Sequence, residues 1–148
     1  MNGQQSGCWW LQAGAIAGLV ALLGVAGCSS LGGGLTKGSA PEVKQAAVRE
    51  RVNARWAALI KGDLDSAYEF LSPTSRETVS LVAFKARRGS LAWKAAAIES
   101  ISCEAEACRV ELKVTYDYPV QGGMMRDIQT PMSETWVLDK GVAWLVFM

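Results

Sequence analysis

The chain has 148 residues, which is enough for one hydrophobic core of ordinary size and too few for two. Its 15 Lys and Arg nearly balance its 14 Asp and Glu, which argues against a nucleic-acid-binding protein, because such proteins need a cationic surplus to displace counterions from phosphates. Because the chain contains no histidine, histidine triads and most zinc sites are excluded, and we expect no metal and no cofactor.

The first recognisable segment is an apolar run over residues 11–25, LQAGAIAGLVALLGV. A helix needs roughly 20 residues to cross the ~30 Å of bilayer hydrocarbon, so this run is short for a membrane span. Its length is typical of the apolar region of a signal peptide, although residues 1–10 carry no Lys or Arg, which signal peptides normally have. The alternative is that residues 11–25 form an uncleaved membrane anchor or a buried core helix.

The apolar run leads into Val25, Ala26, Gly27 and Cys28, which resemble a bacterial lipobox. This resemblance implies that residues 1–27 are a lipoprotein signal peptide and that Cys28 becomes a lipid-bearing N-terminus, carrying fatty acids such as palmitate. Several acyl chains on one residue make release from a membrane negligible. Serine after the cysteine resembles the default for outer-membrane sorting, so the expected location is the periplasmic face of the outer membrane.

Residues 28–40 then have the composition of a flexible tether, because glycine and serine offer little surface to bury. A coil of the 12 residues that follow Cys28 typically spans roughly 20 Å. One folded domain is therefore expected over residues 41–148.

The folded part is predicted to begin with a helix of about 20 residues. Pro41 suits the first turn of a helix, and Gly62 supplies a stop at its end. Five apolar residues recur at helical spacing and predict the buried face, while the arginines between them are expected to point elsewhere. These apolar residues are Val48, Val52, Trp56, Leu59 and Ile60.

Two shorter helices are predicted next. Asp63 is suited to cap the first of them, and Ser72 with Pro73 is expected to end it. Ser80 is suited to cap the second, which is expected to end at Gly89 after two arginines.

After residue 90 the apolar period changes from helical to alternating. Residues 107–118 alternate strictly and predict a strand with one buried face. Residues 91–102 predict a less regular strand with a bulge, although their alanine content leaves a helix open. Residues 130–138 and 142–147 predict two more strands joined by a tight turn, and Gly122 to Met125 predicts a mobile hairpin tip. Helices followed by a four-stranded antiparallel sheet make an α+β fold.

Within this order of elements, one set of residues forms a pattern that spans nearly all of residues 42–148. Its members are Val52, Arg55, Trp56, Gly62, Asp63, Ala67, Tyr68, Phe70, Leu71, Ser72, Pro73, Ser75, Arg76, Phe84, Glu134, Thr135, Trp136, Val137, Gly141, Val142, Ala143 and Trp144. The pattern resembles the nuclear-transport-factor-2-like superfamily. The resemblance implies a cystatin-like cone, in which N-terminal helices pack on a curved four-stranded antiparallel sheet and enclose a pocket.

Two cysteines, Cys103 and Cys108, remain once Cys8 and Cys28 are assigned to the signal peptide and the lipid. Because the expected compartment is oxidising, we predict a disulfide between them across the turn that joins the first two strands. A redox-active pair is the alternative, but it lacks the CxxC spacing.

No residue pattern indicates catalysis, so no catalytic residue is assigned. Some members of the resembled superfamily, such as ketosteroid-isomerase-like enzymes, hold carboxylates and tyrosines in a pocket. Glu134 and Glu99 are the candidate carboxylates here, because each shares strand parity with apolar neighbours. The expected function is a non-catalytic domain that binds a small apolar ligand or an envelope protein, with homodimerisation left open. The alternative is an isomerase or hydrolase that uses a buried carboxylate and a tyrosine. The candidate pocket residues are Trp56, Tyr68, Phe84, Trp93, Tyr116, Tyr118, Glu134, Trp136 and Trp144.

Overall fold

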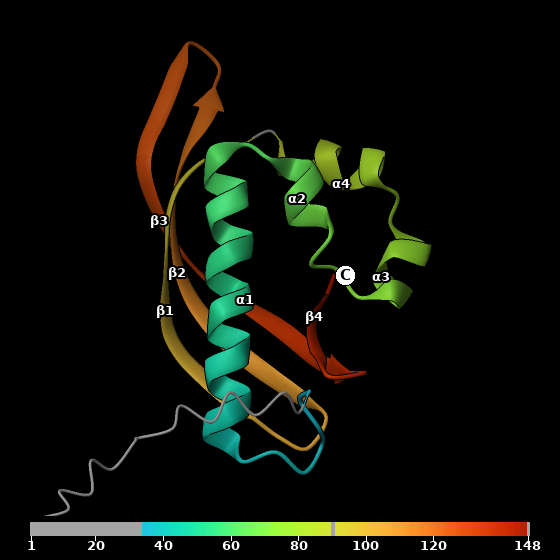
Figure 1. Ribbon diagram of the computed structural model, residues 1–148. Coiled ribbons are helices and arrows are strands. Elements are labelled where there is room, and N and C mark those ends of the chain that lie inside the picture. Colours follow the sequence, from blue (N-terminus) through green and yellow to red (C-terminus); the bar gives the residue numbers. More distant parts are fainter. Residues whose placement is uncertain (1–33, 90, 148) are drawn as a thin grey trace, which may run out of the picture. The chain divides into compact units, whose positions relative to one another are not determined.

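A computed structural model describes residues 34–89 and 91–147 of the chain. Four helices precede an antiparallel sheet whose strands follow one another in chain order, β1-β2-β3-β4 (Figure 1). The elements are α1 (Pro41–Lys61), α2 (Leu64–Tyr68), α3 (Pro73–Thr78), α4 (Leu81–Arg88), β1 (Ala92–Cys103), β2 (Ala107–Val120), β3 (Gly123–Asp139) and β4 (Val142–Val146).

Helix α1 has the bounds that its end residues predict. Pro41 occupies the first helical position, where its missing N–H costs no hydrogen bond. Gly62 closes the helix in the left-handed conformation, with φ 76°, and its N–H bonds to the last-turn carbonyls of Ala58 and Leu59. The predicted apolar face is buried except at Ile60, which is exposed.

The three short helices each begin at a side-chain cap. Asp63 caps α2 and Ser80 caps α4, as predicted. Helix α3 was not predicted, because Ser72 and Pro73 were interpreted as the end of the preceding helix. They instead start a new one, with the Ser72 hydroxyl accepting from the Ser75 N–H and Pro73 in the first turn.

The sheet is a meander of four strands. Residues 92–103 form a strand rather than a helix, and the predicted bulges interrupt its pairing with β2 at Trp93/Ala95 and Ile98/Ser100. Strand β3 begins at Gly123, so the residues expected at a loop tip belong to a long β2–β3 hairpin. Lys140 and Gly141, both with positive φ, form the tight turn between β3 and β4.

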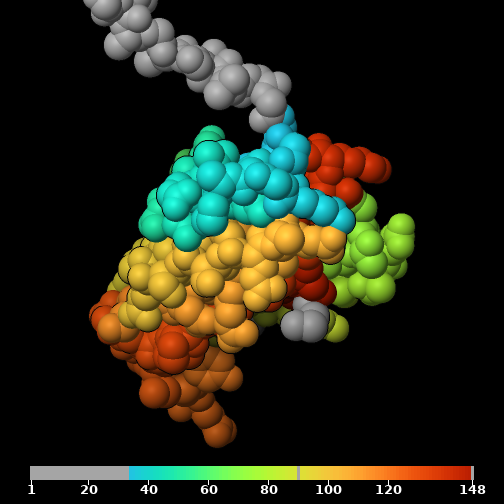
Figure 2. Space-filling model, turned by 90° about the horizontal axis from the view of Figure 1, so that it is seen from below, coloured from blue at the N-terminus to red at the C-terminus, as the bar shows by residue number. Residues whose placement is uncertain are grey.

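The core lies between α1 and the inner face of the sheet. In Figure 2, α1 in cyan lies directly on β1 in yellow. Alternate residues of β2, such as Val110, Leu112 and Val114, point toward α1 and are fully buried. Trp136 of β3 and Leu145 of β4 complete this layer opposite one another.

The helical part does not have the expected arrangement of a cone. Helix α1 lies along the sheet, whereas α2, α3 and α4 gather near β4 (Figure 1). The segment after α2 pairs with β4, because Leu145 donates to the carbonyl of Phe70 and the Leu145 carbonyl accepts from Ser72. The Ser75 hydroxyl of α3 likewise accepts from the Phe147 N–H. The segment between α2 and α3 therefore covers the free edge of β4.

Residues 34–40, assigned by composition to the tether, make defined contacts with the domain. Leu35 bridges Gly141 through a 3.2 Å backbone hydrogen bond. Lys44 in the first turn of α1 is only 4% exposed, and its ammonium donates to the carbonyls of Lys37, Glu104 and Ala105 at 2.6–3.1 Å. We call this set of contacts the Lys44 clamp, because it joins the start of the domain to the β1–β2 turn.

The predictions about residues 1–33, which include the signal peptide and the lipid on Cys28, lie outside the described residues. Within residues 34–89 and 91–147, no helix combines the length and the apolar character needed to cross a bilayer.

Candidate functional site

Two buried residues of opposite charge face each other between α1 and β3. Arg55 is 1% exposed and Glu134 is 6% exposed. The Arg55 Nη1 atom donates to Glu134 Oε1 at 2.5 Å, and the Trp56 indole N–H donates to the same oxygen at 3.0 Å. The Trp136 indole N–H donates to Oε2, also at 3.0 Å. Both oxygens of the carboxylate are therefore occupied by protein donors.

The helical spacing of α1 and the two-residue alternation of β3 place both charged side chains in the core. Arg55 follows Val52 by three residues and precedes Leu59 by four, so it lies on the buried stripe of α1. Glu134 alternates inward with Trp136 and pairs with Val110 across the β2–β3 ladder. Burial lowers the pKa of the Arg55 guanidinium, and the charge of Glu134 opposes part of that shift.

A third charged group, Arg88, approaches from the last turn of α4. Its Nε atom is buried without a hydrogen-bond partner among the described residues, and the guanidinium lies 4.9 Å from the Phe147 ring centre. Burial, together with the neighbouring positive charge of Arg55, lowers the pKa of Arg88 to about 10. At neutral pH the side chain is still a cation.

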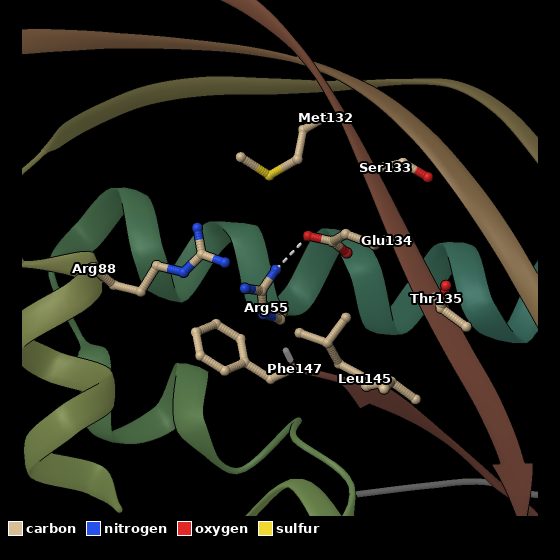
Figure 3. A pocket seen from close by; sticks show the side chains of 9 residues that line it. Arg55, Arg88, Met132, Ser133, Glu134, Thr135, Leu145 and Phe147 are labelled. Carbon is tan, nitrogen blue, oxygen red and sulfur yellow. Dashed lines mark hydrogen bonds and ion pairs between the residues drawn. The ribbon is translucent and has the colours of Figure 1, made fainter. Parts of the chain in front are cut away.

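These three charges line one pocket of about 210 Å³. Figure 3 shows Arg88 and Arg55 directed toward one another, from α4 and α1, with Glu134 on the far side of Arg55. Apolar side chains of Met132, Leu145 and Phe147 form other parts of the wall. The pocket is thus partly apolar and holds two guanidinium groups against one carboxylate.

This arrangement is unsuited to proton transfer by Glu134. A general base needs a carboxylate oxygen within hydrogen-bond reach of a substrate proton. Here an arginine and two indole groups already occupy the oxygens. No tyrosine lines the pocket, so the pairing of a buried carboxylate with a tyrosine is absent from it. The carboxylate instead holds Arg55 in place and balances its charge.

Among the nine predicted pocket residues, Glu134 lines this pocket. Trp144 lines a different one, of about 330 Å³, beside α3. Most of the aromatic residues pack as core: Trp56, Trp93 and Tyr116 form one cluster, with ring centres 5.2 and 5.5 Å apart. Tyr68 and Phe84 form part of a second cluster with Phe147. Tyr118, 44% exposed, is on the projecting hairpin.

Glu99, the other predicted inward carboxylate, is exposed and lies 3.8 Å from the ammonium of Lys113. The bulge between Ile98 and Ser100 reverses the alternation of β1 at this point. A strict alternation counted back from the inward-facing Ile101 therefore places Glu99 on the wrong face of the strand.

The predicted disulfide is present. Cys103 and Cys108 are bonded across the β1–β2 turn, where they also form the last pair of the ladder. Among residues 34–89 and 91–147, no three or more Cys, Asp and Glu side chains are placed to hold a metal ion.

Arg55 and Arg88, the two cations of the pocket, were not among the predicted site residues. The expectation that the arginines of α1 point away from its buried face is wrong for Arg55, which is 1% exposed. Its spacing from Val52 and Leu59 puts it on the apolar stripe, so a signal was present. For Arg88 there was none, because an arginine in the last turn of a helix is ordinarily explained by the helix dipole.

No protein-family model and no curated protein matches the chain. Its backbone resembles solved structures of two proteins described as containing a SEC-C motif. One, from Rhodopseudomonas palustris, has a TM-score of 0.54 and 14% identity, over 66% of this chain and 73% of that one. The other, from Psychrobacter arcticus, has a TM-score of 0.52 and 13% identity, over 69% of this chain and 58% of that one.

At this identity the similarity concerns the fold alone. This backbone similarity and the position of the short helices near β4 show that the predicted nuclear-transport-factor-2-like cone is wrong. The residues that carried that resemblance have general structural roles here. Gly62 ends a helix, Asp63 caps one and Trp136 fills the core. The fold is a four-stranded antiparallel meander with one long and three short helices, similar in backbone to parts of SEC-C motif-containing proteins.

Proposed function

We propose that the chain is a lipoprotein of the bacterial envelope, anchored through fatty acids on Cys28, and that its folded part is a non-catalytic binding domain at the periplasmic face of the outer membrane. The observation that carries the envelope assignment is the disulfide between Cys103 and Cys108, because such bonds persist in oxidising compartments and are rare in the cytosol. The lipobox-like residues 25–28 supply the anchor.

The occupied carboxylate of Glu134 supports binding rather than catalysis. A group that already accepts three hydrogen bonds serves best as a fixed counter-charge. The pocket beside it offers cationic groups and apolar walls, which suits recognition of a small ligand.

The anchoring proposal is tested with Cys28→Ser in the full-length chain. The wild-type protein is expected in the membrane fraction, with an intact mass that equals residues 28–148 plus acyl groups. Cys28→Ser is expected to lose the acyl mass and to leave the membrane fraction or remain unprocessed. Cys8→Ser is the matched control and should change neither the mass nor the fraction, because Cys8 lies in the proposed signal peptide. An unmodified wild-type chain that retains residues 1–27 would overturn the proposal.

The membrane assignment is tested separately with Ser29→Asp. Aspartate after the lipid-bearing cysteine resembles the retention signal of the inner membrane, so this variant should move from outer-membrane to inner-membrane fractions on a density gradient. Ser30→Asp, one residue further on, should not move. Equal distributions for both variants and the wild-type protein would contradict outer-membrane sorting.

A further inference from the structure

The pocket between α1, α4 and β3 contains more positive than negative charge. Two guanidinium groups, Arg55 and Arg88, face one carboxylate, Glu134, which leaves a net charge of one cation. The carboxylate is committed to Arg55 by the 2.5 Å hydrogen bond. Arg88 takes part in no ion pair with a described residue, and its Nε atom is buried without a hydrogen-bond partner among them.

An unbalanced cation beside a buried ion pair is unfavourable. Charged groups taken from water need a partner of opposite charge to recover the lost hydration energy. The two guanidinium groups also repel one another, and Glu134 is the one acidic residue among those that line this pocket. A bound anion would supply the missing charge and accept hydrogen bonds from the free nitrogen atoms of Arg88.

We propose that this pocket binds a small organic monocarboxylate, with its carboxylate on Arg88 and its apolar part against Met132, Leu145 and Phe147. This inference deepens the proposed binding function and rests on it. A single negative charge matches the net charge of the pocket. The planar fork of arginine pairs with a carboxylate through two parallel hydrogen bonds. Inorganic phosphate has no apolar part, so it would leave the apolar side chains of the wall without a contact.

The size of the pocket limits the ligand to about one ring. An apolar cavity of about 150 Å³ accommodates benzene. The pocket of about 210 Å³ has room for a ring of that size with a carboxylate attached. Benzoate is therefore a suitable probe, with benzyl alcohol as the uncharged analogue, benzylamine as the cationic one and inorganic phosphate as the purely ionic one.

The test is calorimetric titration of these probes into the full-length protein, purified in a non-ionic detergent at pH 7, with titrations into detergent alone subtracted. Benzoate is expected to bind at least tenfold more tightly than benzyl alcohol, and benzylamine and phosphate are expected not to bind. Arg88→Gln should weaken benzoate binding by about tenfold or more, the usual effect of losing a charged hydrogen bond.

Arg87→Gln is the matched control, because Arg87 precedes Arg88 in the same helix, is exposed and does not line the pocket. It should change benzoate affinity by no more than about twofold, the scale of a screened surface charge. Circular dichroism establishes that both variants are folded. If Arg88→Gln is not folded, Arg88→Lys, which keeps the charge and loses the planar fork, should show a loss of several-fold.

Three outcomes would overturn the inference. These are equal affinity for benzoate and benzyl alcohol, equal losses in Arg87→Gln and Arg88→Gln, or tighter binding of phosphate than of benzoate. Each of them would leave the mass and fractionation results for Cys28 unchanged. Conversely, an unlipidated chain that still binds benzoate through Arg88 would remove the anchoring proposal and leave the pocket in place.

Discussion

Arg55 and Glu134 depend on each other because both are withdrawn from water. Replacing one partner leaves the other charge buried without compensation, which typically costs about 3–5 kcal/mol. We therefore expect Glu134→Gln to lower the free energy of unfolding by about that amount, as measured by urea denaturation. Glu111→Gln is the control: Glu111 pairs with Arg109 at the surface, where water screens the pair, and its loss should change the free energy of unfolding far less than Glu134→Gln does.

The double variant Arg55→Met with Glu134→Gln separates the cost of an unpaired arginine from the value of the ion pair itself. It removes the buried cation and keeps an amide oxygen as acceptor for the indole N–H groups that face Glu134. The double variant should accordingly be more stable than Glu134→Gln alone. Equal losses in the two would show that the ion pair, and not the orphaned charge, provides the stability.

Because the pKa of Asp63 is lowered, we expect this residue to make the stability of the fold depend on pH only under acidic conditions. Its carboxylate accepts from the hydroxyl and the N–H of Ser66, and these hydrogen bonds lower the pKa of Asp63 in the folded state. A carboxyl group with a depressed pKa stabilises the fold above its unfolded pKa and loses this effect as pH falls through the folded value. The stability advantage of the wild-type protein over Asp63→Asn should therefore be present at pH 6 and decrease as the pH falls below about 3.9, the ordinary pKa of an unfolded aspartate. A constant difference between pH 2 and pH 6 would contradict it.

For individual residues, the alternation of side chains along a strand correctly predicted that Glu134 points inward, because β3 is regular between Met132 and Leu138. The same rule failed for Glu99, because a bulge adds one residue to the count. The partners of Glu134 could not be predicted, since Arg55 is 79 residues away and only the packing of α1 on the sheet brings the two together.

Among the elements, the β1–β2 hairpin is held both by its ladder and by the Cys103–Cys108 bond. The closed loop is small, so the entropic gain from the bond is at the low end, about 2 kcal/mol. Cys103→Ser with Cys108→Ser should remain folded and lose about that much stability in urea. The wild-type protein in a reducing agent should show the same loss, and complete unfolding in either case would contradict this assignment.

Helix α4 carries Arg88, so its cap affects the pocket. The Ser80 hydroxyl accepts from the Ala83 N–H at 3.2 Å. Ser80→Ala should cost about 1 kcal/mol, the typical value of an N-cap, while Ser80→Asp should be neutral. Unfolding in urea measures both variants. A negligible effect of alanine would mean that α4 is held by Phe84 in the core rather than by its cap.

The ends of a helix could be predicted where the residue type at that position is compatible with only one role, either starting or ending a helix. Pro41 and Gly62 bound α1 in the sequence as they do in the structure. Helix α3 was missed because Ser72–Pro73 is compatible with either the end or the start of a helix. The first half of β3 was missed because residues 123–129 are mostly exposed and lack an apolar alternation, so only their pairing with β2 makes them a strand.

For the whole molecule, the Lys44 clamp determines where the folded part begins. Lys44→Gln removes the donor that holds the Lys37 carbonyl, and trypsin cleaves after Lys37 only when this backbone can leave the domain. We expect cleavage after Lys37 to become several-fold faster in Lys44→Gln, as followed by mass spectrometry. Lys61→Gln at the other end of α1 is the control and should leave the rate unchanged. Equal rates in all three proteins would show that the clamp does not hold this segment.

The clamp also limits how far the domain can stand from the bilayer under the proposed anchoring. Five residues, 29–33, separate Cys28 from Gly34, and a fully extended chain of five residues reaches at most about 18 Å. The folded part would then begin within about 18 Å of the lipid-bearing residue. The anchored domain would then encounter a protein partner in the same leaflet far more often than a partner that diffuses through the periplasm.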